Sequence, residues 1–140
     1  MKVNRIKYDL SLMKFISLFE TITGAKLKDV VDEESRLLFV VEEGEIGKAI
    51  GKNGVNVKRL ENVLNKMIKI VEFNNDLLQF IRNLVYPLAA REIKEENKIV
   101  TIAGQDVKTK GLLIGRNAQN LRAYENVVKR YFEIEGIKVV

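Results

Sequence analysis

The spacing of apolar residues in the first half of the chain predicts six secondary-structure elements. From Tyr8 to Ile22, apolar side chains recur every three or four positions, as on one face of an amphipathic helix that Asp9 or Ser11 caps and Gly24 ends. The elements expected next are a modest strand with its charges on one face at 27–31, a continuous apolar strand at 37–41, a short apolar helical turn at 46–50, a helix carrying Val57, Leu60, Val63 and Leu64, and a strand at 67–73.

The second half of the chain repeats this order. Asn75 or Asp76 can cap a helix that Pro87 stops, because proline cannot continue helical hydrogen bonding. The remaining expected elements are a weak strand at 90–94, a turn at 95–97, a strand at 99–103 ended by Gly104, a short helix to Ile114, a helix carrying Leu121, Tyr124, Val127, Val128 and Tyr131, and a strand at 134–140. Both halves therefore read helix, strand, strand, helix, helix, strand.

Two segments, 47–64 and 111–128, match each other when the sequence is shifted by 64 positions. Eight of the eighteen pairs are identical, where chance gives about one. The identical pairs are Gly47/Gly111, Ile50/Ile114, Gly51/Gly115, Asn53/Asn117, Asn56/Asn120, Glu61/Glu125, Asn62/Asn126 and Val63/Val127, and the pairs Lys52/Arg116 and Lys58/Arg122 keep their charge. The identities are densest around a turn, and core packing alone would let such a loop drift. The duplication therefore indicates that the loop is the working part.

Each matched segment contains a short loop between two predicted helices, at 51–54 and 115–118. Glycine there lets the backbone turn sharply and lets a ligand approach without a Cβ in the way. The first N–H groups of the helix after Gly54 lack intrahelical partners and attract an anion. Lys52 adds a positive charge, and Asn53 can cap the helix or bind a phosphate or a base. Both side chains should point to solvent if the glycines alone set the turn, and the pattern favours a phosphodiester ligand.

Other interpretations of this loop fit its residues less well than the binding of a phosphodiester. A glycine pair can merely form a corner between helices, but this one is duplicated and basic. A nucleotide-binding P-loop is excluded, because Gly47 and Gly51 are separated by three residues rather than four and Asn53 stands where Ser or Thr would bind Mg²⁺. The nearby acidic residues are expected to be solvated turn residues rather than a catalytic pair; they are Glu42, Glu43 and Glu45.

The amino-acid composition excludes several classes of function. The 140 residues are 46% hydrophobic and 31% charged, with a formal net charge of +5, which makes a polyanionic partner plausible. The absence of His and Cys excludes thiolate, imidazole and Cys/His zinc chemistry, so we expect no enzyme, no metal site and no cofactor. Lys14 and Glu20 interrupt the apolar stretch near the N-terminus, and no apolar window is long enough to span a bilayer. We therefore expect a soluble cytoplasmic protein with no membrane contact.

The I-G-x-x-G loop between two helices resembles the KH domain, whose loop of this kind clamps the backbone of four nucleotides. A helix and a strand before this core are similar to the type II arrangement, and two copies with almost no linker resemble the NusA family of transcription factors. The stretch from Ile114 to Arg122 is similar to the I-G-R-x-x-Q-N-x-R stretch of that family's second KH domain, and the stretch from Ala49 to Leu60 is similar to the short archaeal versions. The resemblance covers Tyr8 to Val140.

This resemblance implies an α+β fold of two tandem type II KH domains, residues 1–74 and 75–140, each a three-stranded sheet with helices on one face. It implies a monomeric RNA-binding transcription factor that binds single-stranded RNA, has RNA polymerase as a further candidate partner, and modulates termination, antitermination or pausing. The RNA-binding residues it implies are Lys48, Ile50, Gly51, Lys52, Asn53, Gly54, Asn56, Lys58, Arg59, Ile114, Gly115, Arg116, Asn117, Ala118, Gln119, Asn120 and Arg122. Two alternatives stay open: a ribosome-associated or ribosome-assembly RNA-binding protein, and a module that mainly docks on proteins of a transcription complex.

The second loop departs from the family pattern at one position, where Ala118 replaces the second glycine. If this position requires a left-handed backbone, alanine costs roughly 1 kcal/mol. If it is simply the first residue of the helix, alanine fits well. We therefore expect the first loop to contribute more to RNA binding than the second.

Overall fold

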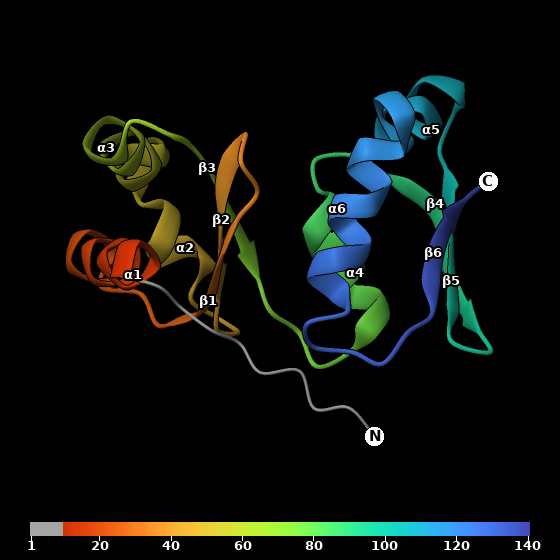
Figure 1. Ribbon diagram of the computed structural model, residues 1–140, viewed down its shortest axis with the longest axis horizontal. Helices are drawn as coiled ribbons and strands as arrows, with labels where there is room; N and C mark the ends of the chain where they lie inside the picture. Colours follow the sequence, from red (N-terminus) through yellow and green to blue (C-terminus); the bar gives the residue numbers. More distant parts are fainter. Residues whose placement is uncertain (1–9) are drawn as a thin grey trace. The chain divides into compact units, whose positions relative to one another are not determined.

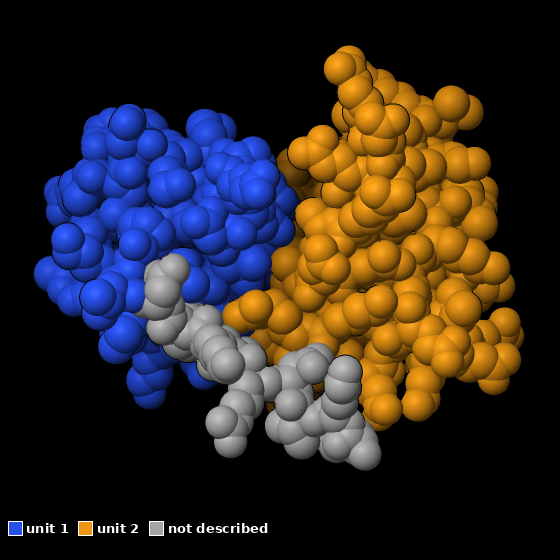
Figure 2. Space-filling model, in the orientation of Figure 1, with its two compact units in different colours: residues 1–74 blue, residues 75–140 orange. Residues whose placement is uncertain are grey.

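The computed structural model describes residues 10–140, which lie in two compact units, residues 1–74 and residues 75–140 (Figure 2). Each unit contains helices and one three-stranded sheet, so the fold is α+β (Figure 1). The start expected for the first helix, at Tyr8 and Asp9, lies outside the described residues. Among residues 10–140, no helix is both long and apolar enough to cross a lipid bilayer.

The first unit follows the predicted order of elements. Its elements are α1 (Leu10–Thr23), β1 (Leu27–Asp32), β2 (Arg36–Val41), α2 (Ile46–Ile50), the 3₁₀ turn η1 (Lys52–Gly54), α3 (Val55–Leu64) and β3 (Met67–Glu72). The central strand β2 pairs antiparallel with β1 and parallel with β3. Because α1 begins at Leu10, Ser11 lies inside the helix, and the expectation that Ser11 caps it is wrong.

The core of the first unit is built on alternate residues of β2, because side chains of a strand alternate between its two faces. Leu37, Phe39 and Val41 pack in one cluster with Phe19 of α1 and Leu60 of α3. The Phe19 and Phe39 rings stack with their centroids 4.5 Å apart. This packing fixes α3 against the sheet and so fixes the loop that precedes α3.

The second unit repeats the architecture. Its elements are α4 (Leu77–Val85), β4 (Ala90–Glu96), β5 (Ile99–Gly104), α5 (Val107–Ile114), the 3₁₀ turn η2 (Arg116–Ala118), α6 (Gln119–Val128) and β6 (Gly136–Val139). Asp76 caps α4 by accepting a hydrogen bond from the Gln79 N–H at 3.2 Å, and the helix ends at Val85, two residues before Pro87. In its sheet, β5 pairs antiparallel with β4 and parallel with β6.

Two local expectations are corrected. Strand β4 continues through Glu96, and the turn is formed by Asn97 and Lys98, which both take positive φ angles of 52° and 66°. Strand β1 does not keep its charges on one exposed face, since Asp29 is 1% exposed. A register shift between Leu27 and Asp29 interrupts the regular alternation of that strand and accounts for the difference.

Candidate functional site

Two loops occupy the same place in the two units. In the first unit, α2 ends at Ile50, Gly51 reverses the chain, and η1 leads directly into α3. In the second unit, α5, Gly115, η2 and α6 follow in the same order. We call residues 51–54 the first loop and residues 115–118 the second loop. Both loops join two helices, as the sequence predicted.

The two loops have nearly the same backbone conformation. Gly51 has φ 77° and ψ 169°, and Gly115 has φ 75° and ψ 173°. This conformation is essentially restricted to glycine. Asn53 and Asn117 both lie in the left-handed region, with φ 57° and 56°, which asparagine tolerates better than most residues. The expectation that the glycines alone set the turn is therefore wrong, because Asn53 contributes a left-handed residue of its own.

Ala118 adopts the left-handed conformation that the sequence left undecided. Its φ of 59° and ψ of 25° match those of Gly54, at 73° and 20°. Each of these two residues is the N-cap of the helix that follows its loop. Alanine therefore accepts backbone strain of roughly 1 kcal/mol at this position. The loop keeps its shape despite this substitution.

Part of each loop's hydrogen-bonding capacity is used within the loop. The Gly54 N–H donates to the Gly51 carbonyl at 3.1 Å, and the Ala118 N–H donates to the Gly115 carbonyl at 3.2 Å. The Val55 N–H donates to the Lys52 carbonyl. Because the N-cap of α3 is Gly54, the expectation that Asn53 caps this helix is wrong. These N–H groups therefore already have partners within the loop.

Most of the predicted binding residues are exposed at the loops and on the helices beside them. The exposed ones are Lys48, Ile50, Lys52, Asn53, Lys58 and Arg59 in the first unit, and Arg116, Asn117, Gln119, Asn120 and Arg122 in the second. The half-buried ones are Gly51, Gly54, Asn56, Ile114, Gly115 and Ala118. Lys52 and Arg116, which occupy the same position in the two loops, therefore present their charges to solvent.

Asn56 and Asn120 form a hydrogen bond across the base of each loop. The Asn56 side-chain amide donates to the Lys48 carbonyl at 3.0 Å, and the Asn120 amide donates to the Leu112 carbonyl at 2.8 Å. Each bond joins the helix after the loop to the helix before it. We call the bond in each unit the asparagine clamp of that unit.

Another duplicated residue also has a structural role. The Glu61 carboxylate accepts a hydrogen bond from the Ile68 N–H at 3.3 Å, and the Glu125 carboxylate accepts one from the Ile137 N–H at 2.7 Å. In each unit this bond ties the helix after the loop to the last strand of the sheet. The residues that are identical in the two units therefore include residues that hold the loop in place as well as exposed residues of the loop.

Sequence reasoning missed some exposed residues beside the loops. Val55, directly after the first loop, is 46% exposed, and Leu112, before the second, is 47% exposed. Lys108 and Lys110 are exposed on α5. These two lysines could have been found in the sequence, because they lie close together just before the second loop, at positions where the first unit has Gly44 and Ile46. The second loop therefore has extra basic residues beside it.

The acidic residues before the first loop differ from one another. Glu42 and Glu43 are exposed, in line with the expectation of solvated side chains. Glu45 is half-buried, and its carboxylate accepts a hydrogen bond from the Lys26 N–H at 2.7 Å. This contact gives Glu45 a structural role. Across residues 10–140, no group of three acidic side chains is arranged to hold a metal ion.

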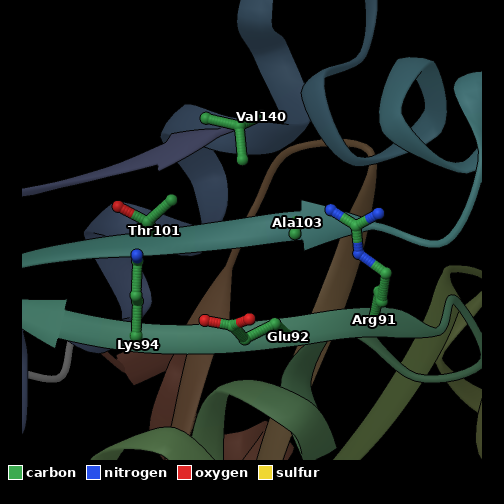
Figure 3. A pocket seen from close by; sticks show the side chains of 6 residues that line it. All are labelled: Arg91, Glu92, Lys94, Thr101, Ala103 and Val140. Atoms are coloured by element: carbon green, nitrogen blue, oxygen red, sulfur yellow. The ribbon is translucent and has the colours of Figure 1, made fainter.

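A small hollow lies on the sheet of the second unit, apart from the loops (Figure 3). It has a volume of about 130 Å³. Its lining residues are Arg91, Glu92, Lys94, Thr101, Ala103 and Val140. None of these residues belongs to either loop, and their charges are mixed. The hollow is therefore no part of the loop site.

Comparison with known proteins identifies relatives of the chain. Residues 15–86 match the family model described as KH domain. The chain is 34% identical over 139 residues to the "Probable transcription termination protein NusA" of Methanococcus vannielii, across 97% of this chain and 80% of that protein. The protein of the same name from Thermoplasma acidophilum is 31% identical over 142 residues, across 99% of both chains.

A bacterial relative and a solved structure extend these similarities. The "Transcription termination/antitermination protein NusA" of Rickettsia conorii is 37% identical over 84 residues, which cover 55% of this chain and 16% of that protein. A solved structure described as the crystal structure of APE1850 superposes with a TM-score of 0.74 and 31% identity. The superposition covers 95% of this chain and 100% of that one.

Proposed function

Because this chain belongs to the NusA family of KH-domain proteins, we propose that it is a single-stranded RNA-binding transcription factor built from two tandem type II KH domains. The domains correspond to residues 1–74 and 75–140. The assignment of the second unit as a KH domain is supported by its order of elements and its strand pairing, which are the same as in the first unit. Its loop also has the same backbone conformation.

The observation that carries this proposal is the repeated loop with an exposed cation. Lys52 and Arg116 stand at the same position of two loops whose backbones agree closely. A phosphate group next to such a loop can approach the glycine backbone while the cation balances its charge. Two such loops in one chain favour a ligand with repeated phosphates over a mononucleotide.

The surroundings of the loops favour single strands over duplex. Exposed apolar side chains lie directly beside the first loop, where Ile50 is 36% exposed and Val55 is 46% exposed. Unstacked bases can pack on apolar side chains, whereas the bases of a duplex remain stacked inside it. With about four nucleotides for each KH domain, each loop would bind a stretch of about four nucleotides.

The test of this proposal is a comparison of ligand classes. Fluorescence anisotropy with labelled single-stranded RNA, duplex RNA and duplex DNA should give clearly tighter binding to the single strand. If about three to five phosphates are neutralised, the slope of log K against log salt should be about −2 to −4. Equal binding to duplex DNA, or a much steeper slope, would show that a diffuse basic surface does the binding instead.

The regulatory part of the proposal is that RNA binding modulates termination or antitermination by RNA polymerase. It is supported by the archaeal relatives named "Probable transcription termination protein NusA", which align with nearly the whole chain. Terminator read-through by the polymerase of the source organism should change when the protein is added, and a variant impaired in RNA binding should not change it. Co-sedimentation with ribosomes, or polymerase binding that is independent of both loops, would favour the alternative functions.

A further inference from the structure

The asparagine clamp is present in both units with the same geometry. Each asparagine lies in the first turns of the helix after the loop, and its side-chain N–H donates to a carbonyl eight residues earlier. The same side chain also fills the space beside the first glycine of the loop. A Cβ added to Gly51 would lie 2.8 Å from Asn56 Nδ2, and one added to Gly115 would lie 2.8 Å from Asn120 Nδ2.

This geometry gives the asparagines a task distinct from that of the exposed cations. We propose that Asn56 and Asn120 are positioning residues that hold each loop in its RNA-binding conformation and do not themselves contact RNA. The proposal rests on the proposed function, since it assumes that the loops bind RNA. Each clamp closes the base of its loop, and the two residues with positive φ, Gly51 and Asn53, lie between the two segments that the clamp of the first unit joins.

Asparagine has the size and hydrogen-bonding groups that this task requires. Its amide supplies an N–H donor, which aspartate lacks when ionised, and it is one methylene shorter than glutamine. Leucine has a similar shape but cannot donate a hydrogen bond. Asn56 and Asn120 are identical although the residues before them, Val55 and Gln119, differ. A constraint on the backbone of the loop explains this identity. A role in reading RNA bases would not require the clamp at all.

The experiment compares Asn56→Ala and Asn56→Leu with a matched control, Asn62→Ala. Asn62 is exposed on the same helix and is also identical in both units, where its counterpart is Asn126. Amide hydrogen exchange is measured first on the protein without RNA. Loss of the clamp should speed exchange at Gly51 and Gly54 about fivefold, the effect of one typical hydrogen bond, and the control should not change it.

RNA titration of the same variants then separates positioning from contact. Both Asn56 variants should bind RNA about fivefold to tenfold more weakly while keeping the salt slope of the wild type. Lys52→Gln, which removes the proposed contact with a phosphate, should instead reduce that slope by about 0.7. Asn56→Leu serves as a second variant should Asn56→Ala fail to fold, and Asn120→Ala repeats the test in the second unit.

Each outcome decides the proposal. Unchanged exchange in the free protein, with weaker RNA binding, would overturn it in favour of direct RNA contact by Asn56. Faster exchange with unchanged RNA affinity would also overturn it, because the clamp would then have no influence on binding. If the wild type itself does not bind single-stranded RNA, the proposed function fails, and the exchange measurement still reports on the clamp independently.

Discussion

The side-chain amide of Asn56 fills the space where a side chain on Gly51 would have to lie. A Cβ added to Gly51 would stand 2.8 Å from Asn56 Nδ2 and 2.9 Å from its Cγ. Gly51 also has a φ of 77°, a backbone angle that residues with a side chain rarely adopt. The glycine is therefore required twice, once by its backbone conformation and once by its asparagine neighbour.

This relationship predicts that Gly51→Ala is considerably more harmful than Gly54→Ala. Nothing lies within 4 Å of a Cβ built on Gly54, so alanine there accepts only left-handed strain of about 1 kcal/mol. Gly51→Ala adds a steric clash to its strain, and we expect a loss of about 2–3 kcal/mol in the free energy of unfolding. Urea denaturation of both variants measures the difference.

A double-mutant cycle checks the cause. Asn56→Ala removes the atoms that an alanine at position 51 would meet, so the double variant Gly51→Ala/Asn56→Ala should lose less stability than the sum of the two single variants. In the second unit the added Cβ would also meet the backbone N of Asn120 at 2.9 Å, so Asn120→Ala should relieve Gly115→Ala less completely. Strict additivity in the first unit would contradict the contact.

Ala118→Gly is expected to stabilise the second unit. Glycine adopts the left-handed conformation of this residue without strain, although it also raises the entropy of the unfolded chain. Relief of roughly 1 kcal/mol of strain exceeds this entropy cost slightly, so we expect a net gain of up to about 0.5 kcal/mol, read from the urea midpoint. RNA affinity should stay unchanged or rise slightly, since the loop already has the right shape.

The control for this prediction is Ala123→Gly. Ala123 lies inside α6, where glycine should cost about 1 kcal/mol, so the same chemical change should have the opposite sign five residues away. If both variants lose stability, Ala118 is not under left-handed strain in solution.

The lowered pKa of Lys69 predicts how the stability of the folded protein changes at alkaline pH. Burial, followed by the charge of Arg36, lowers the pKa of Lys69 from 10.5 to about 8, although Glu33 acts in the opposite direction. Between these two pH values the unfolded chain binds the proton and the folded protein does not, so the contribution of Lys69 to stability rises as the pH rises from 8 to 10.5. Lys69→Met should remove this rise.

Urea midpoints measured at several pH values in this window test the prediction. Lys138 lies on β6, as Lys69 lies on β3, and its side chain is exposed, so Lys138→Met is the matched control and should leave the profile close to that of the wild type. A Lys69→Met profile parallel to that of the wild type would show that this lysine titrates normally.

The sequence was sufficient to predict the order of elements and the place of both loops. The continuous apolar run at 37–41 lies in β2, and all five of its side chains are buried. The apolar spacing indicated α1, α3, α4 and α6, although α6 ends at Val128 and the predicted Tyr131 lies beyond it. These features depend on the period of the apolar residues, which is local information. For the same reason the turn at Asn97 and Lys98 was placed too early, because the charged residues before it suit an exposed strand as well as a turn.

The details of the site depend on contacts and angles that no local pattern contains. Whether Ala118 is left-handed cannot be read from its neighbours, since alanine is equally common at the start of a helix. The asparagine clamp joins residues eight positions apart across a turn whose shape must be known first. The sequence therefore predicted Asn56 and Asn120 as binding residues, and the proposal that they position the loops rests on hydrogen bonds that only the structure shows.

The relative contribution of the two loops to RNA binding stays a prediction. The sequence favoured the first loop because only it has both glycines, whereas the structure gives the two loops the same backbone. Lys52→Glu and Arg116→Glu make the same kind of charge reversal at matched positions. We expect Lys52→Glu to weaken RNA binding more, and a larger loss for Arg116→Glu would reverse the ranking.

We propose that the two loops bind RNA through their exposed cations. The decisive measurement is an anisotropy titration of labelled single-stranded RNA with Lys52→Glu/Arg116→Glu, beside the control Lys14→Glu/Lys94→Glu. The control reverses two exposed charges on α1 and β4, so both variants have the same net charge. Repulsion of a phosphate by each new carboxylate is on the order of a few kcal/mol at contact distance, so the loop variant should bind at least about tenfold more weakly than the control. Equal affinities of the two variants would show that Lys52 and Arg116 do not hold the RNA.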